Sequence, residues 1–211
     1  MKYSYIEELA KRRPELAGLI CDIEKVCDLI IHAYSKRCKV IVCGNGGSCS
    51  DAGHIVGELM KGFHKKRQLS DDYKGKLTQY GGVDLAAKLQ TPLRAIDLTA
   101  MSALNTATAN DIDANYIYAQ QVVGLADPGD IFFGISSSGN SCNVHYAAIA
   151  AKAAGAVLIG LTGAIGGNMY GSGLYDVIIR VPECITYRIQ EEHISVYHAV
   201  CATVEAVFFI D

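Results

Sequence analysis

The chain has 211 residues, of which 50% are hydrophobic and 19% charged, and its formal net charge is -3. This length fits one compact domain or one domain with a helical extension, and the apolar content excludes a mainly disordered chain. No basic field covers the chain as a whole, so we expect no binding to nucleic acid. The 21 Gly against 4 Pro indicate tight turns and phosphate-type loops rather than a linker protein.

The first residues and the cysteines predict a cytoplasmic protein. Residues 1–8 contain neither an apolar segment nor a small-residue cleavage site, so we expect no secretory signal. The 8 Cys form no C-x-x-C pair, and most lie in apolar stretches where a free thiol packs like a small hydrophobe. Glycines interrupt the uncharged segment 153–175, which favours a buried strand and a Gly-rich turn over a membrane helix.

Residues 1–37 are predicted to form a helical extension. Apolar residues recur at helical spacing over residues 5–36, and Pro14 interrupts this stripe, so two helical pieces are expected. A long amphipathic helix needs a partner surface, either on its own domain or on another subunit. Together with the apolar terminal helix predicted at 187–210, the stripe favours a homo-oligomer, with intramolecular packing as the alternative.

Strands and helices alternate through the rest of the chain. Short β-branched runs predict five strands, at residues 39–44, 94–98, 131–136, 157–161 and 177–181. Helical patterns cover 100–110, 116–125, 143–154 and a segment capped by Ser48 or Asp51 that reaches about Phe63. Residues 64–68 are expected to form a solvated turn, and residues 69–92 a long loop with at most one short helix. This alternation predicts an α/β fold with a doubly wound parallel sheet.

Two loops follow predicted strands and open predicted helices. In an open α/β sheet, ligands bind beyond the carboxyl ends of the strands, where helix N-termini offer free backbone N–H groups. Small residues let an anion approach the backbone, and hydroxyls add donors, so both loops suit one sugar phosphate. Neither has a dinucleotide or nucleotide triphosphate motif. The alternative is that these residues only make turns and caps. The loop residues concerned are Asn45, Gly46, Gly47, Ser48, Ser136, Ser137, Ser138 and Ser141.

Histidines and carboxylates form a second candidate group. His54 and Glu58 are four residues apart, so both lie on one face of the predicted helix. The last helix carries Gln190, His193 and His198, which can address one site about two turns wide. Such a set can bind zinc or supply an acid and a base, and spacing alone does not choose between the two histidines. A surface carboxylate and a core histidine are the structural alternatives.

Residues 43–59, 134–144 and 188–205 together resemble the phosphoheptose isomerases, which are sedoheptulose 7-phosphate isomerases of the sugar-isomerase (SIS) fold. The resemblance runs from about residue 5 to the end. It implies a five-stranded parallel sheet flanked by helices, usually assembled as a tetramer with sites between subunits. Residues 1–211 are then expected to form a single SIS domain, in which 1–37 is the helical extension and 69–92 a loop insertion.

The resemblance also implies roles for the residues at matching positions. Glu58 and His198 match the catalytic pair, which decides for His198 over His193. In members that carry zinc, the ligands match His54, Glu58, Gln190 and His198, so we expect one zinc ion per subunit. Ser48, Ser136, Ser138 and Ser141 match the phosphate-binding hydroxyls, and Asn45 lines the sugar end. The expected substrate-binding set is Asn45, Gly46, Gly47, Ser48, Ser136, Ser137, Ser138, Ser141 and Gln190.

The implied reaction is aldose–ketose isomerisation of sedoheptulose 7-phosphate to D-glycero-D-manno-heptose 7-phosphate in heptose biosynthesis. Glu58 would act as base and His198 would move the other proton of an enediol(ate) route. If zinc holds both residues, neither is a free base. Either a ligand then detaches when substrate binds, or the zinc is partly structural or inhibitory, and the sequence leaves these alternatives open.

The sequence departs from the family pattern on the side of the substrate hydroxyls. Residues 69–92 look longer than the usual connection, and residues 99–102 lack an acidic residue, although Asp97 lies nearby. Tyr187 stands where an aspartate is common. An isomerase for another sugar phosphate is therefore one alternative. A non-catalytic SIS adaptor that binds a protein partner is the other, although the retained set of Glu58, Gln190 and His198 argues against it.

Overall fold

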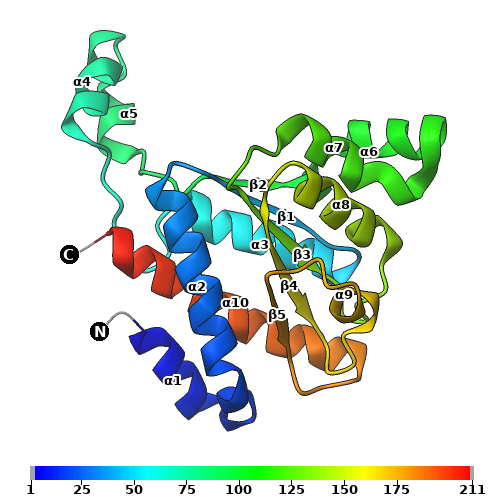
Figure 1. Cartoon of the computed structure of the whole chain (residues 1–211). Helices are drawn as coiled ribbons and strands as arrows, with labels where there is room; N and C mark the ends of the chain where they lie inside the picture. Colours follow the sequence, from blue (N-terminus) through cyan, green and yellow to red (C-terminus); the bar gives the residue numbers. More distant parts are fainter. Residues whose placement is uncertain (1–2, 210–211) are drawn as a thin grey trace.

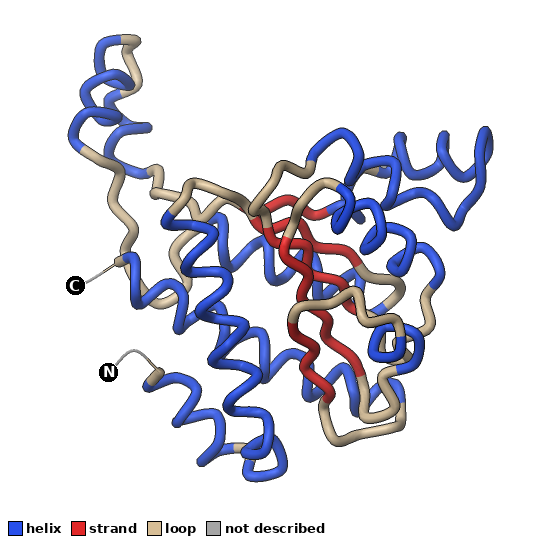
Figure 2. Tube along the Cα trace, in the orientation of Figure 1, coloured by secondary structure: helices blue, strands red, loops and turns tan. Residues whose placement is uncertain are grey.

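Five strands form one parallel sheet that lies between two layers of helices (Figures 1 and 2). The structure is a computed structural model that describes residues 3–209. The strands are β1 (Val40–Cys43), β2 (Ala95–Asp97), β3 (Ile131–Ile135), β4 (Val157–Thr162) and β5 (Val177–Arg180). The α-helices are α1 (Ser4–Arg12), α2 (Ile20–Ser35), α3 (Gly47–Met60), α4 (Asp71–Gln79), α5 (Val83–Lys88), α6 (Ser102–Thr108), α7 (Ile117–Leu125), α8 (Cys142–Ala153), α9 (Gly167–Gly171) and α10 (Thr186–Phe208). Short 3-10 or π-helical segments are η1 (Pro14–Leu19), η2 (Leu98–Ala100), η3 (Ala109–Asp113) and η4 (Ala114–Tyr116).

The strand order β2-β1-β3-β4-β5 confirms the predicted parallel sheet. From β1 the chain crosses to β2 on one side, and from β3 it crosses to β4 on the other side. The direction in which successive strands are added to the sheet therefore reverses between β1 and β3, which pair directly and in parallel, with Cys43 opposite Gly134. Such a reversal is the position at which open α/β sheets bind ligands.

Successive residues of each strand enter different cores, because side chains alternate across a sheet. Val40 and Val42 of β1 belong to the core under α2, α3 and α10, and Ile41 and Cys43 to the core under α7 and α8. All four β1 residues are buried. Burial on both faces explains why the strand sequence is continuously apolar rather than alternating.

The N-terminal stripe packs on its own chain. Pro14 begins η1 and separates α1 from α2, as the two expected helical pieces require. Ile6, Ile23 and the α10 residue Val204 are fully buried in one common core. Most of the two faces that the sequence offered as evidence for an oligomer is thus covered within the chain, although Val207 on α10 is exposed. Residue 210 of the predicted terminal helix lies outside the described residues.

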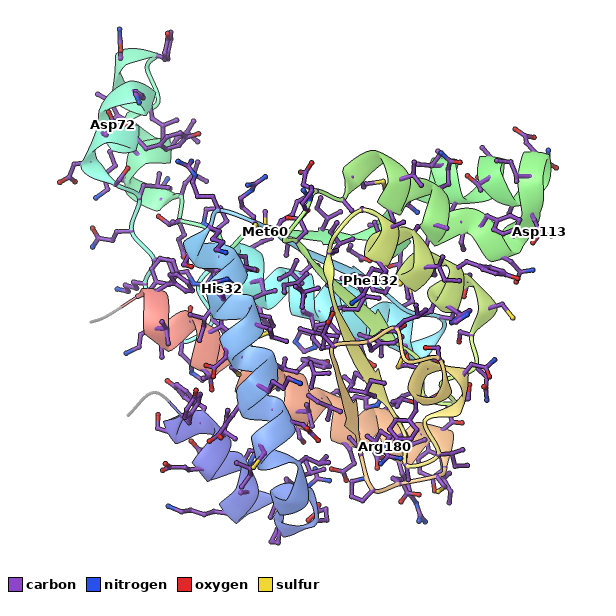
Figure 3. All side chains as sticks on the ribbon, in the orientation of Figure 1. His32, Met60, Asp72, Asp113, Phe132 and Arg180 are labelled. Carbon is purple, nitrogen blue, oxygen red and sulfur yellow. The ribbon has the colours of Figure 1, made fainter. Side chains whose placement is uncertain are left out.

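Residues 69–92 hold two helices, so the expectation of a loop with at most one short helix was wrong. The hairpin of α4 and α5 stands away from the body of the molecule, and Figure 3 labels Asp72 on it. The Ser70 hydroxyl caps α4 by accepting a hydrogen bond from the Tyr73 N–H at 3.3 Å. Local polar contacts, such as Lys76 to Asp72 at 2.6 Å, support a helix that buries no side chain.

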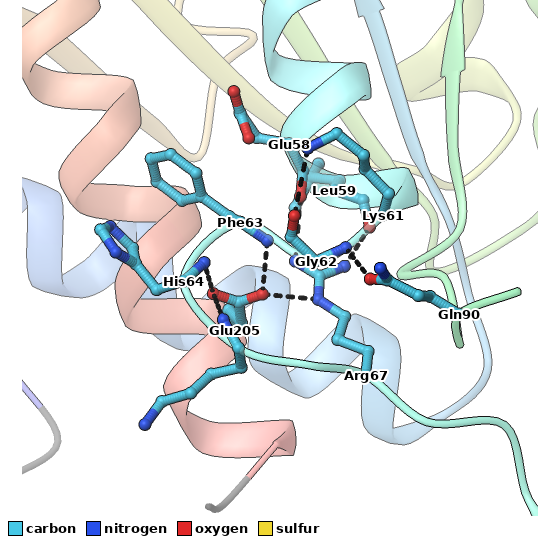
Figure 4. Close-up of polar contacts among 10 residues, drawn as sticks. Glu58, Leu59, Lys61, Gly62, Phe63, His64, Arg67, Gln90 and Glu205 are labelled. Carbon is cyan, nitrogen blue, oxygen red and sulfur yellow. Dashed lines mark hydrogen bonds and ion pairs between the residues drawn. The ribbon is translucent and has the colours of Figure 1, made fainter. Parts of the chain in front are cut away.

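The segment 64–68, predicted as a solvated turn, contains a fully buried arginine. Arg67 Nε lies 2.7 Å from Oε1 of Glu205, and both side chains are almost inaccessible (Figure 4). The same carboxylate accepts the backbone N–H of Phe63 at 2.8 Å and of His64 at 2.7 Å. The ion pair therefore fixes the segment after α3 onto α10. A charge run in sequence does not reveal a partner 138 residues away.

Within residues 3–209, no helix is both long and apolar enough to cross a membrane. The uncharged segment 153–175 instead forms β4 and the short helix α9, where a Gly-rich turn was predicted.

Candidate active site

The two predicted loops meet at the reversal point of the sheet. The first follows β1 and the second follows β3, and these strands are neighbours. Asn45 of the first loop and Asn143 at the start of α8 exchange two side-chain hydrogen bonds, of 2.8 Å and 3.0 Å. Tyr118 on α7 donates to the carbonyl of Gly44 at 2.7 Å. The sequence argument did not single out Asn143 or Tyr118, because their contacts span long sequence separations.

The helices behind both loops begin without a side-chain cap. Helix α3 starts at Gly47, and Gly46 before it has φ of 57°, a left-handed conformation that favours glycine. The expectation that Ser48 or Asp51 caps this helix was wrong, because the helix begins before both residues. Helix α8 starts after Ser141, whose hydroxyl makes no cap. Loop carbonyls accept the N–H groups of Ser48 and Cys49, and Asn143 Oδ1 accepts that of Val144, so each N-terminus offers an anion mainly its partial positive charge at the reversal point.

The second loop carries its hydroxyls at different depths. Ser136 is buried and its Oγ lies 2.9 Å from that of Ser141, whereas Ser138 is exposed. The Ser138 hydroxyl accepts the Asn140 N–H at 3.2 Å. A cavity of about 150 Å³ borders this loop, with Ser137 and Ser138 among its lining residues. This arrangement offers hydroxyl and amide donors to an anion without a nearby lysine or arginine from the loop.

Gln190 lies against the first loop. A Cβ atom added to Gly47 would collide with the side-chain amide of Gln190, so a larger residue at this position would displace that amide. Gln190 begins the stretch of α10 that continues to His198, and α10 packs against α3. Two neighbouring helices thus run from the loops toward the histidines.

His54, Glu58 and His198 converge as predicted from the family resemblance. His54 Nε2 lies 3.1 Å from Glu58 Oε1 and 3.4 Å from His198 Nε2, and the three ligand atoms all lie within 4.8 Å of one another. A tetrahedral zinc site with bonds of about 2.0–2.1 Å separates its ligands by roughly 3.3 Å. These two distances are close to that value, so the three residues fit a tetrahedral metal ion. The Gln190 amide, beside Gly47, remains a predicted ligand.

The two catalytic candidates differ in what surrounds them. Glu58 uses Oε1 toward His54, while its buried Oε2 has no hydrogen-bond partner among the described residues. Burial and the neighbouring His54 lower the pKa of His198, although Glu58 opposes this shift. His198 is therefore neutral at neutral pH, and one of its ring nitrogens keeps a lone pair. It also borders a cavity of about 230 Å³ together with His64.

A buried tyrosine and a buried aspartate stand behind His54. The Tyr197 hydroxyl lies 2.8 Å from His54 Nδ1 and 3.4 Å from Asp51 Oδ1. Burial raises the pKa of Asp51 to about 6, which the hydrogen bond from Tyr197 and the charge of His54 only partly offset. Neither residue was proposed from the sequence as part of the site, since Asp51 was considered only as a helix cap. The i, i+3 spacing of Asp51 and His54 on one helix face was the available signal.

His193, which spacing had left equal to His198, lies outside the cluster. It is fully buried, and burial lowers its pKa to about 4 despite a backbone contact with Thr162. Its imidazole is therefore a neutral core group. The two histidines are five residues apart on α10, and this places them on different faces of the helix.

Acid should destabilise the fold through His193. Its pKa is about 4 when folded and about 6.5 when unfolded, so between these values the unfolded chain binds a proton that the folded chain does not. The contribution of neutral His193 to the free energy of unfolding is complete above pH 6.5. It is lost as the pH falls toward 4, and the total loss is on the order of 3 kcal/mol. Urea unfolding at several pH values should show a shallower decline for His193→Leu than for the wild type; equal slopes would contradict the assignment.

Two of the departures from the family pattern, at residues 99–102 and at Tyr187, lie in different parts of the structure. Asp97 accepts the Thr99 N–H at 2.8 Å, and its other oxygen lies close to Gly53 of α3. Asp97 is therefore near the helix that carries His54. Tyr187, at the start of α10, is exposed, and its ring faces the Arg188 guanidinium.

Sequence similarity to known proteins shows the family of this chain. The SIS domain family profile matches residues 77–163. The phosphoheptose isomerase of Shewanella sp. (strain W3-18-1) is 34% identical, over 99% of this chain and 95% of its own length. The probable phosphoheptose isomerase of Thermoplasma acidophilum is 38% identical over 97% of each chain. This chain belongs to the phosphoheptose isomerase family.

Solved structures of the family agree with the fold described above. The phosphoheptose isomerase of Neisseria gonorrhoeae superposes with a TM-score of 0.74 at 30% identity, covering 95% of this chain and 94% of that one. The phosphoheptose isomerase of Francisella tularensis gives 0.73 at 29% identity, covering 96% and 95%. The five-stranded parallel sheet flanked by helices is therefore the SIS fold expected of a phosphoheptose isomerase.

Proposed function

We propose that this chain is an aldose–ketose isomerase that converts sedoheptulose 7-phosphate into D-glycero-D-manno-heptose 7-phosphate for heptose biosynthesis. The observation that carries the proposal is the placement of the His54, Glu58 and His198 cluster on α3 and α10, where α3 follows the glycine-rich loop that adjoins the serine-rich loop. One end of this site suits a phosphate, and the other end suits proton transfer. Membership of the phosphoheptose isomerase family supports the same substrate.

The proposed mechanism moves one proton between neighbouring carbons. Glu58 removes the C1 proton of the ketose, and the same proton or a solvent proton returns at C2. Neutral His198 moves the proton between the two substrate oxygens. Both residues are also proposed zinc ligands, so a residue that transfers a proton would have to leave the metal when substrate binds.

We propose that His54, Glu58 and His198 hold one zinc ion per subunit, with Gln190 as the fourth ligand. Bound zinc would stabilise negative charge on the enediolate oxygens as a Lewis acid. The support is the ligand-to-ligand spacing of the three residues and their nitrogen and oxygen donors.

We also propose that the protein is cytoplasmic and forms a homo-oligomer, a tetramer with sites between subunits. Support comes from exposed apolar side chains on the outer helical layer, rather than from the N-terminal stripe. These side chains are Leu104, Ile112, Tyr116, Val123, Tyr146 and Ile149. An exposed apolar group of this kind is typical of a protein–protein interface.

Steady-state kinetics on a panel of ketose phosphates tests the substrate. The account expects the highest kcat/KM for sedoheptulose 7-phosphate. A higher value for a pentulose or hexulose phosphate would favour the alternative of a different sugar-phosphate isomerase. Absence of turnover on the whole panel, with folded protein, would favour the adaptor.

Ser138→Ala should mainly raise KM, because the exposed hydroxyl is placed to donate to the substrate phosphate. Hydrogen bonds to charged groups contribute about 1.5–3 kcal/mol, which corresponds to roughly 10–100-fold in KM. Ser35→Ala, at the end of α2, is the matched control and should leave the kinetics unchanged. An unchanged KM for Ser138→Ala would remove this loop from the phosphate site.

A further inference from the structure

Three side chains from two helices, two of them buried, form a hydrogen-bonded row behind the proposed metal site. Asp51 and His54 belong to α3, and Tyr197 belongs to α10. Tyr197 and Asp51 are 1% and 5% exposed, so water does not replace their partners. The hydroxyl of Tyr197 is 2.8 Å from His54 Nδ1 and 3.4 Å from Asp51 Oδ1, and the two rings meet edge to face.

The protons in this row can be assigned by counting donors. A tyrosine hydroxyl has one proton, an ionised carboxylate can only accept, and a neutral imidazole has one N–H and one lone pair. If Tyr197 donates to Asp51, its oxygen faces His54 Nδ1 with a lone pair, so Nδ1 must carry the proton. The opposite arrangement leaves Asp51 Oδ1 facing an oxygen lone pair. Asp51 Oδ2 already lacks a partner among residues 3–209, so that arrangement would leave the whole carboxylate of Asp51, which is 5% exposed, unsatisfied. The favoured arrangement takes the His54 N–H from Glu58 instead, but the Glu58 side chain is 14% exposed and faces the place of the cation.

We propose that Asp51 and Tyr197 are positioning residues that hold His54 in its Nδ1–H tautomer and so present Nε2 as a lone pair to a divalent cation. This inference rests on the metal site of the proposed function. A histidine ligand commonly donates its other N–H to an oxygen, which fixes the ring and its tautomer. Here the oxygen is a tyrosine hydroxyl that is itself oriented by a carboxylate.

The assignment explains the electrostatics of the cluster. In the Nδ1–H tautomer, the Nε2 lone pair faces Glu58 Oε1 at 3.1 Å, and His198 Nε2 is 3.4 Å away. A lone pair and a carboxylate oxygen repel each other at this distance unless a cation lies between them. The row from Asp51 to His54 thus disfavours a direct hydrogen bond between His54 and Glu58. It favours a cation bound between these two side chains.

Nitrogen NMR of the full chain after chelator treatment tests the tautomer without metal or substrate. Selective labelling of histidine nitrogens should show His54 protonated at Nδ1 and bare at Nε2 in the wild type. Tyr197→Phe keeps the ring but removes the hydroxyl, so the Nε2–H form should appear. Asp51→Asn should act in the same direction, because its amide no longer requires the tyrosine proton.

Zinc affinity, measured by competition with a chromophoric chelator, provides the second measurement. Loss of the partner behind a metal-binding histidine costs about 10–100-fold in affinity, so Tyr197→Phe should bind zinc that much more weakly. Tyr175→Phe is the matched control, since it removes a buried hydroxyl that has no partner among the described residues. It should leave both the tautomer and zinc affinity unchanged.

Each outcome separates this inference from the proposed function. An Nε2–H tautomer in metal-free wild type overturns the inference, whatever the affinity for zinc. An unchanged zinc affinity in Tyr197→Phe also overturns it. The predicted tautomer in a wild-type protein that binds no zinc supports the hydrogen-bonded row and overturns the proposed metal site.

Discussion

Glu58→Gln is expected to lower kcat for isomerisation by about 10²–10⁴-fold, the usual contribution of a positioned general base. The glutamine keeps the size of the side chain but cannot accept the C1 proton. The phosphate loops and their helix N-termini are untouched, so substrate should still bind. Substrate-induced stabilisation against thermal unfolding measures that binding separately from turnover.

The matched control for this variant is Glu191→Gln, which removes an exposed carboxylate from α10. It should retain wild-type kcat and KM. Substantial activity in Glu58→Gln would show that another group is the base. Loss of both activity and substrate-induced stabilisation would instead mean that Glu58 holds the site together.

Glu205→Gln is expected to reduce the free energy of unfolding by about 3–5 kcal/mol, because it leaves the buried Arg67 without its counter-charge. Burial alone raises the pKa of Glu205. The backbone N–H groups of Phe63 and His64 and the Arg67 guanidinium together outweigh burial and lower this pKa. The carboxylate is therefore charged at neutral pH, and the segment after α3 depends on it (Figure 4).

Urea unfolding measures this effect, with Glu191→Gln again as the control. Changes at an exposed position should stay within about 0.5 kcal/mol. The double variant Arg67→Met/Glu205→Gln should recover part of the loss, since it removes the unpaired charge. A loss below about 1 kcal/mol in Glu205→Gln would contradict the assigned role of the ion pair.

The loss should also reach the active site. The Phe63 ring lies 5.5 Å from that of His198, and His64 lines the cavity beside it. When the carboxylate no longer holds the two backbone N–H groups, this wall of the site loses its support. Glu205→Gln should therefore lower activity even at temperatures where the protein stays folded.

The strands and the two loops were predictable because their signals are local. A short β-branched run such as residues 39–44 has few alternatives to a buried strand, and its glycines mark the turn that follows. His54 and Glu58 share a helix face by spacing alone. The two loops lie together because parallel βα units place the carboxyl ends of neighbouring strands at the same edge of the sheet.

The features that sequence reasoning missed depend on contacts between distant residues or on burial. Arg67 and Glu205 are 138 residues apart, so residues 64–68 resembled a solvated charge run. Spacing left His193 and His198 equal and the family resemblance chose His198, but only packing shows that His193 is a core residue. Helix α4 is different, because the cap at Ser70 and the acidic residues after it were a local signal that outweighed the polar composition.

The measurement that tests the central claim most directly is NMR of sedoheptulose 7-phosphate incubated in D₂O with the purified, metal-analysed protein. The account predicts an aldoheptose 7-phosphate with deuterium at C2, formed by wild type and by Glu191→Gln but not by Glu58→Gln. Added zinc should increase the rate of a chelator-treated sample. Neither conversion nor exchange by folded, zinc-supplied wild-type protein would contradict the assigned reaction.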